Sequence, residues 1–131
     1  MTPHKENHRL KNMRILGENI PLSLASQKNS LLRCLGAMCG AMPVRQVLLF
    51  GSHARGQARR ESDVDLCIVA EGAGHQMGAA KCFRRAMRGI RPKPAFSLVP
   101  ITPKRLAEKR KTGDHFFQTV AKEGICLAQE D

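Results

Sequence analysis

Apolar residues recur along the chain in patterns that predict alternating helices and strands. Over residues 26–41 they fall at helical spacing and give an amphipathic helix, which Pro43 ends. The runs 44–50 and 64–70 are short, apolar and poor in charge, as in buried strands. The segment between these runs, residues 52–57, is expected to form a short helix or a tight turn.

The clearest helix covers residues 75–90, because apolar residues occupy one side of it and cations the other. Residues 95–102 are predicted to form a third strand, with Pro100 indicating an edge position or a bulge. A charged helix follows over residues 103–111, and Gly113 breaks it. A shorter helix over residues 114–122 and a last strand over 125–128 complete the pattern.

This order of elements predicts an α/β (α+β) fold with a small mixed sheet and helices packed mainly on one side. Residues 1–20 are polar and basic, with weak periodicity, and are expected to form a flexible arm. Residues 21–131 are expected to form a single domain. The chain of 131 residues is 42% hydrophobic, which suffices for one modest core.

The formal net charge is +11, which favours anionic partners such as nucleotides, nucleic acid or acidic protein surfaces. Residues 81–111 hold eleven Lys or Arg and one acid, Glu108. The same block could also be a solvated helix face. The five cysteines form no C-x-x-C pair, and their odd number is typical of a reducing, cytoplasmic location. No apolar run reaches the roughly 20 residues that a membrane helix needs.

Two acids open the second strand and suggest a metal site. Side chains two positions apart in a strand point to the same face, so Asp63 and Asp65 would lie about 7 Å apart at the backbone. Neighbouring carboxylates repel each other unless a cation lies between them. Mg²⁺ prefers such oxygen ligands together with substrate phosphates. A solvated strand end is the alternative interpretation of the pair.

The first strand ends in Gly51-Ser52, and ten residues lie between Ser52 and Asp63. A glycine at this point lets the backbone approach a phosphate closely, and the serine hydroxyl adds a donor. An ordinary strand-to-helix turn with a serine cap is the alternative. His53 lies inside this loop and is expected to face solvent, although it could also contact phosphate.

Together, G-S-x-A-R-G and S-D-x-D-L resemble the active-site signature of the DNA polymerase beta-like nucleotidyltransferase superfamily. The chain is most similar to its minimal nucleotidyltransferases, over about residues 31–127. The matching positions are Gly51, Ser52, Ala54, Arg55, Gly56, Ser62, Asp63, Asp65 and Leu66.

The resemblance implies a role for each of these residues. Gly51 and Ser52 would hold the triphosphate of ATP or another nucleoside triphosphate, with Arg55 and Ser62 as further nucleotide-binding residues. The catalytic pair Asp63 and Asp65 would bind Mg²⁺, at a two-ion site, and orient the α-phosphate. As an alternative, Arg55 could support the loop or pair with an acid such as Glu61.

The sequence departs from the family at one functional position. The family places a third carboxylate on the next strand, and aligning Thr102-Pro103 with the T-P of the family puts Ser97 there. A serine supplies neither an anionic ligand nor a general base near neutral pH. The metal site is therefore expected to be weakened.

Three functions follow from the sequence. The first is an Mg²⁺-dependent enzyme that transfers AMP from ATP to a hydroxyl of a protein or small molecule. Minimal family members often pair with a helical HEPN-domain protein as the antitoxin of a toxin–antitoxin system. The second is a nucleotide- or partner-binding module that does not turn over, because of Ser97. The third, a nucleic-acid binder, ranks last because the chain has few aromatic residues for base stacking.

Overall fold

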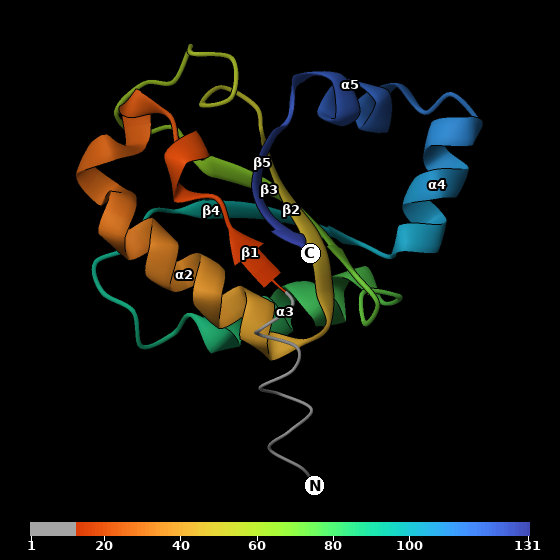
Figure 1. Cartoon of the computed structure of the whole chain (residues 1–131), viewed down its shortest axis with the longest axis horizontal. Helices are drawn as coiled ribbons and strands as arrows, with labels where there is room; N and C mark the ends of the chain where they lie inside the picture. The colour runs from red at the N-terminus through yellow and green to blue at the C-terminus, as the bar shows by residue number, and fades with distance from the viewer. Residues whose placement is uncertain (1–12) are drawn as a thin grey trace, which may run out of the picture.

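Five strands form one mixed sheet in the order β1-β5-β2-β3-β4 (Figure 1). The computed structural model describes residues 13–131. The central strands are β2 (Val44–Phe50), β3 (Val64–Ala70) and β5 (Ile125–Glu130), and the edges are β1 (Met13–Ile15) and β4 (Phe96–Ile101). Only β3 and β4 run parallel, while the other described neighbours are antiparallel. The mixed sheet predicted from sequence is thus confirmed.

Alternating residues of β3 face two separate apolar clusters, one on each side of the sheet. Val64, Leu66 and Ile68 belong to the larger cluster, which lies beneath α2 (Lys28–Ala41) and α3 (Gln76–Ala86). Cys67 and Val69 belong to the smaller cluster. The larger share of the core therefore lies on the α2 and α3 side, but two further helices pack on the other face, so the prediction that helices pack mainly on one side is wrong.

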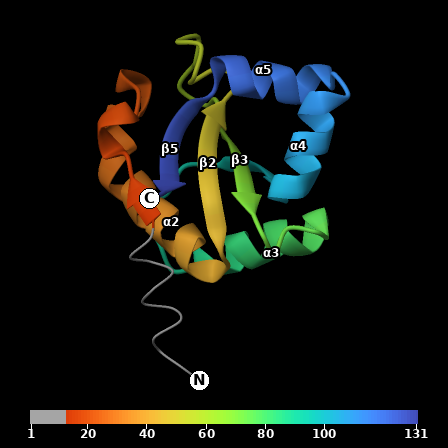
Figure 2. The same ribbon diagram turned by 45° about the vertical axis from the view of Figure 1, so that its right-hand side comes forward.

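The opposite face of the sheet is covered in part by α4 (Pro103–Lys111) and α5 (His115–Glu123) (Figure 2). Leu106 of α4 and Phe117 and Val120 of α5 pack on this face. Thr102 caps α4 by accepting a hydrogen bond from the Arg105 N–H at 3.1 Å.

The prediction of a flexible arm is wrong for residues 13–20. β1 pairs with β5, with Met13 opposite Glu130, and Met13 and Ile15 pack against the larger core cluster. The short 3₁₀ helices η1 (Gly17–Asn19) and η2 (Leu22–Gln27) follow. Sequence periodicity missed β1 because its three residues are too few to show alternation. The remainder of the predicted arm, residues 1–12, lies outside the described residues.

The other predicted elements lie close to their observed bounds. Both central strand predictions, 44–50 and 64–70, match β2 and β3. Pro100 lies on β4, an edge strand, as predicted. The predicted helix 75–90 is shorter in the structure, because its last residues form turns after Ala86. Between residues 13 and 131, no helix is long and apolar enough to cross a membrane.

Candidate active site

The two predicted acids lie at the start of β3, on the face opposite the larger core cluster. Val64 between them is buried in that cluster, so Asp65 points to the other side of the sheet. Asp65 is half-buried, and Asp63, just before the strand, is exposed. The negative charge of Asp63 acts on Asp65 and contributes to raising its pKa.

Gly51 lies directly against the carboxyl group of Asp65. Its φ of +78° is in the left-handed region that only glycine adopts without strain. A Cβ added at Gly51 would overlap Oδ2 of Asp65. The preceding residue, Phe50, is the cross-strand partner of Asp65. Gly51 and Asp65, which belong to two separate parts of the sequence motif, are therefore adjacent in space.

Residues 51–57, which we term the glycine turn, form a series of tight turns rather than a helix. The Arg55 N–H donates to the Gly51 carbonyl at 3.1 Å, and the Gln57 N–H donates to the Ser52 carbonyl at 2.9 Å. In this part of the described chain, no hydrogen bond of the turn uses the N–H groups of Ser52 and His53. Two successive free amides beside the carboxylates suit an anion.

His53 is buried, with 5% of its surface exposed, so the prediction that it faces solvent is wrong. Its Nδ1 lies 2.8 Å from the Ser23 hydroxyl, and its Nε2–H donates to the Ser62 carbonyl at 3.3 Å. Ser23 belongs to η2, thirty residues earlier in the chain, which covers the turn. His53 thus ties the glycine turn to η2 and to the residue that precedes Asp63.

Ser62 and Arg55 support the loop through contacts of their own. The Ser62 hydroxyl accepts a hydrogen bond from the Arg59 N–H at 2.8 Å and closes the loop before β3. The Arg55 side chain donates to Gln57 at 3.2 Å and lies 3.9 Å from a carboxylate oxygen of Glu123. Glu61, considered as a partner from sequence, does not pair with it in the structure. Arg55 remains exposed beside the turn.

Ser97, which the sequence comparison puts at the position of the family's third carboxylate, lies next to Asp65 in the sheet. It is the register partner of Asp65 on the adjacent parallel strand β4. The Ser97 side chain lowers the pKa of the Asp65 carboxyl and so favours its ionised form. Within residues 13–131, no group of three or more His, Cys, Asp or Glu side chains is arranged to hold a metal ion. The site thus offers two carboxylates and a hydroxyl.

The pKa of Asp65 is raised above its ordinary value. Burial is the largest cause, and repulsion by Asp63 adds to it. The side chains of His53, Ser97 and Arg55 lower the pKa in part. A carboxylate that is partly desolvated and repelled by another favours a cation between the two.

Two carboxylates and a hydroxyl fit a divalent ion that a bound nucleotide helps to coordinate. They are too few for a metal site in which the protein supplies all the ligands. Mg²⁺ is usually held by one or two carboxylates together with substrate phosphates and waters. Asp63 and Asp65 supply the carboxylates, and the free amides of the glycine turn lie beside them for the phosphates. Ser97 can contribute only a neutral oxygen.

A pocket of about 540 Å³ continues the same face of the sheet beyond Ser97, and sequence analysis did not predict it. Val99 and Ile101 of β4 form its floor, and Arg105 of α4 and Phe116 of α5 lie at its sides. Phe116 packs edge-to-face on Phe50, with ring centroids 5.3 Å apart. It is 41% exposed, an unusual position for a large apolar side chain.

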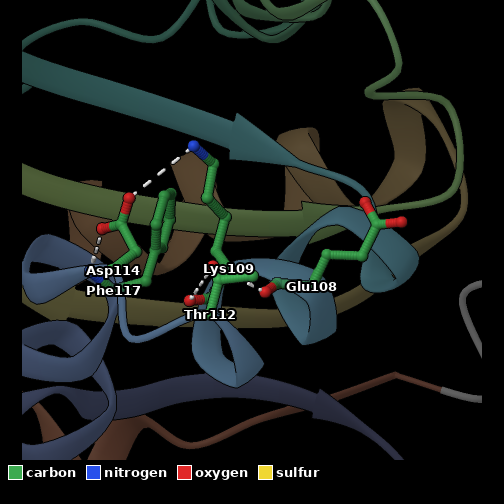
Figure 3. A network of polar contacts seen from close by, with 5 residues as sticks. All are labelled: Glu108, Lys109, Thr112, Asp114 and Phe117. Atoms are coloured by element: carbon green, nitrogen blue, oxygen red, sulfur yellow. Dashed lines mark hydrogen bonds and ion pairs between the residues drawn. The ribbon is translucent and has the colours of Figure 1, made fainter.

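The junction of α4 and α5 sets the position of this aromatic wall (Figure 3). The Asp114 carboxylate accepts a hydrogen bond from the Phe117 N–H at 3.1 Å and lies 3.6 Å from the Lys109 ammonium. Thr112 donates to the carbonyls of Glu108 and Lys109 at 3.0 and 3.2 Å. No signal in the sequence reveals the pocket, because residues of four separate elements form it.

A family model for the nucleotidyltransferase domain matches residues 31–115. The matched range contains the glycine turn, both carboxylates and Ser97, and it ends at the first residue of α5. No curated protein and no solved structure matches the sequence significantly.

Proposed function

Because the chain belongs to the nucleotidyltransferase domain family, we propose that it transfers a nucleoside monophosphate from a nucleoside triphosphate to a hydroxyl group. Nucleotidyl transfer is the general reaction of this family. AMP from ATP is the first case to test, with a hydroxyl of a protein or a small molecule as acceptor. The proposal assigns catalysis to Asp63 and Asp65.

One observation carries the proposal. Gly51 adopts a positive φ and leaves no room for a side chain against Asp65. A turn with free amides is thereby packed against Asp65, which Asp63 precedes by two residues, so a polyphosphate and its counter-ion can be bound side by side. A strand end that served only the fold would require neither feature.

Different residues would bind the phosphates of the nucleotide and the divalent cation. The amides of Ser52 and His53 and the Ser52 hydroxyl would bind the terminal phosphates. Arg55 would add positive charge at the edge of the turn. A divalent cation bound by Asp63, Asp65 and the phosphates would offset the negative charge that develops during transfer.

In the reaction, the acceptor oxygen forms a bond to the α-phosphorus. The bond from this phosphorus to the bridging oxygen breaks, and pyrophosphate leaves. The hydroxyl proton is released to solvent, because Ser97 is not a base near neutral pH. We further propose that the 540 Å³ pocket receives the nucleoside, with Phe116 against the base.

The test is transfer of label from ATP labelled at the α-phosphate, with Mg²⁺ and a panel of hydroxyl-bearing acceptors. The wild-type chain should label an acceptor and release pyrophosphate. Asp63→Asn, a neutral variant of similar shape, should lower transfer about 100-fold or more. Chelation of divalent ions should do the same. Transfer that is absent, or equal in the variant, overturns the proposal.

A second function is favoured by Ser97, the partner of Asp65 in the sheet. Without a third carboxylate the domain could bind nucleotide and not turn it over. ATP would then raise the melting temperature of the wild-type chain in the presence of Mg²⁺, and no pyrophosphate would be released. This outcome separates a binding module from the enzyme proposed above.

A protein acceptor is the next question. The resemblance to minimal nucleotidyltransferases supports a helical HEPN-domain protein as the first partner to test, in a toxin–antitoxin pair. Co-purification of the two proteins and label transfer to a hydroxyl of the partner would support it. A cytoplasmic location stays a proposal that depends on the odd number of cysteines.

A further inference from the structure

A second groove, of about 590 Å³, lies between the C-terminal half of α3 and the segment that leads into β4. We term it the basic groove. Its charged lining consists only of cations, and all of these are exposed. They are Lys81, Arg84, Arg85, Arg88, Arg91 and Lys93.

None of these six cations forms an ion pair with another described residue. Two of them are instead fixed by carbonyl groups of the backbone. Arg84 donates to the Phe96 carbonyl at 3.1 Å, and Lys93 donates to the Ile90 carbonyl at 3.2 Å. The groove therefore keeps its full positive charge for an outside ligand, while part of its lining is held in position.

The groove borders the candidate active site through the backbone of one strand end. Ala95, one of its lining residues, accepts a hydrogen bond from the Val64 N–H at 2.9 Å. Val64 lies between Asp63 and Asp65, and Ser97 follows Ala95 by two residues. Helix α3 packs beside β4, the edge strand that carries Ser97 (Figure 1).

We propose that the basic groove binds the phosphodiester backbone of a nucleic-acid strand. Such a backbone carries one negative charge per phosphate at regular spacing, and the groove offers a row of unpaired cations. Four of the six are arginines, whose planar guanidinium groups bind phosphate through two parallel hydrogen bonds. The proposal goes beyond nucleotidyl transfer, because this binding does not need the carboxylates.

An acidic protein is the less suitable occupant. Specific protein interfaces have an apolar centre with exposed anchor residues. The larger apolar residues of the groove, Met87, Pro94 and Phe96, are all buried, and only the small Ala95 is exposed. A phosphodiester backbone, in contrast, can be bound through the positive charges of the groove alone. The scarcity of aromatic residues, which ranked nucleic acid last from sequence, argues against base stacking but not against contacts to phosphates.

The test is fluorescence anisotropy with short single-stranded RNA and DNA oligonucleotides of one sequence. The wild-type chain should bind at low salt, and its affinity should fall steeply as salt increases. The double variant Arg85→Ala/Arg88→Ala should bind about tenfold more weakly, and its log–log salt slope should be smaller by roughly 1 to 2. RNA and DNA probes distinguish contacts to the sugar from contacts to phosphate alone.

The matched control is Lys104→Ala/Lys111→Ala, which removes the same charge from exposed positions on α4. It should stay within about twofold of wild type. Equal losses in both double variants would overturn the proposal, since net charge and not the groove would then explain binding. So would undetectable binding at low salt, or equal affinity for polyglutamate. Asp63→Asn should bind as wild type does, so a failure of nucleotidyl transfer would leave this result unaffected.

Discussion

Asp65 and Ser97 face each other as register partners on the parallel strands β3 and β4. Both lie on the sheet face opposite the larger core cluster, because Val64 and Phe96, one position earlier in each strand, belong to that cluster. The Ser97 side chain lowers the pKa of the Asp65 carboxyl and so favours its ionised form. Because Ser97 lies beside Asp65 in the sheet, we propose that an acid at this position would act as a third ligand.

Ser97→Asp should raise nucleotidyl transfer by about tenfold or more, because it adds a carboxylate beside Asp65 that can bind a cation and accept a proton. Without a divalent ion the same variant should unfold more easily, since a third negative charge repels the other two. Steady-state transfer rates and thermal melts with and without Mg²⁺ measure both effects. Ser97→Asn is the neutral control, and a rise in activity there too would contradict this explanation.

Gly51→Ala should lower the free energy of unfolding by about 3 kcal/mol, from left-handed backbone strain and from overlap with Asp65. Gly56→Ala is its control. Gly56 also has a positive φ, of +71°, but a Cβ there would meet open space. It should cost only about 1 kcal/mol. Denaturant unfolding of both variants measures the difference, and equal losses would show that contact with Asp65 is unimportant.

His53→Ala should destabilise the domain by about 2 kcal/mol, since it leaves the Ser23 hydroxyl and the Ser62 carbonyl without their partner. The glycine turn should also loosen, which would weaken nucleotide binding. His115→Ala, at an exposed position, should change stability by less than about 0.5 kcal/mol. Urea unfolding and ATP titration are the measurements. If His53→Ala left the free energy of unfolding unchanged, other contacts would have to hold the turn.

Asp114→Ala should lower stability by about 1 kcal/mol, because it removes the cap of α5. Asp114→Asn keeps a capping oxygen and loses only the ion pair with Lys109, so it should cost a few tenths of a kcal/mol. If the two variants lose the same stability, the ion pair and not the cap fixes the junction. Thermal unfolding compares them.

The thiols should react in two groups. Burial raises the pKa of the Cys39 thiol to about 11 and that of Cys67 to about 12, and it also raises the pKa of Cys34. At about pH 8 these three remain protonated and inaccessible in the folded chain. A thiol reagent should therefore label only Cys82 and Cys126 before unfolding, and all five cysteines afterwards. Mass spectrometry of the labelled peptides identifies them, and early labelling of Cys67 would contradict the structure.

The sequence predicted those features whose signal lies within a few neighbouring residues. β2 and β3 have their predicted bounds, because short apolar runs that end at glycine or begin at an acid determine them locally. The alternation of strand side chains placed Val64 in the core and Asp65 on the other face. The residue before the turn, Phe50, then pairs with Asp65, so the motif also predicted that Gly51 and the acids meet.

Only the tertiary structure decided how distant segments cover one another. His53 is buried because η2 lies over it, and β1 forms because β5 offers an edge more than a hundred residues later. The 540 Å³ pocket and the basic groove also combine separate elements. Backbone conformation follows local residue order, whereas burial and the gathering of charges depend on which remote surfaces pack together. The amino-acid sequence by itself determined the carboxylate pair and its turn, and the packing decided what surrounds them.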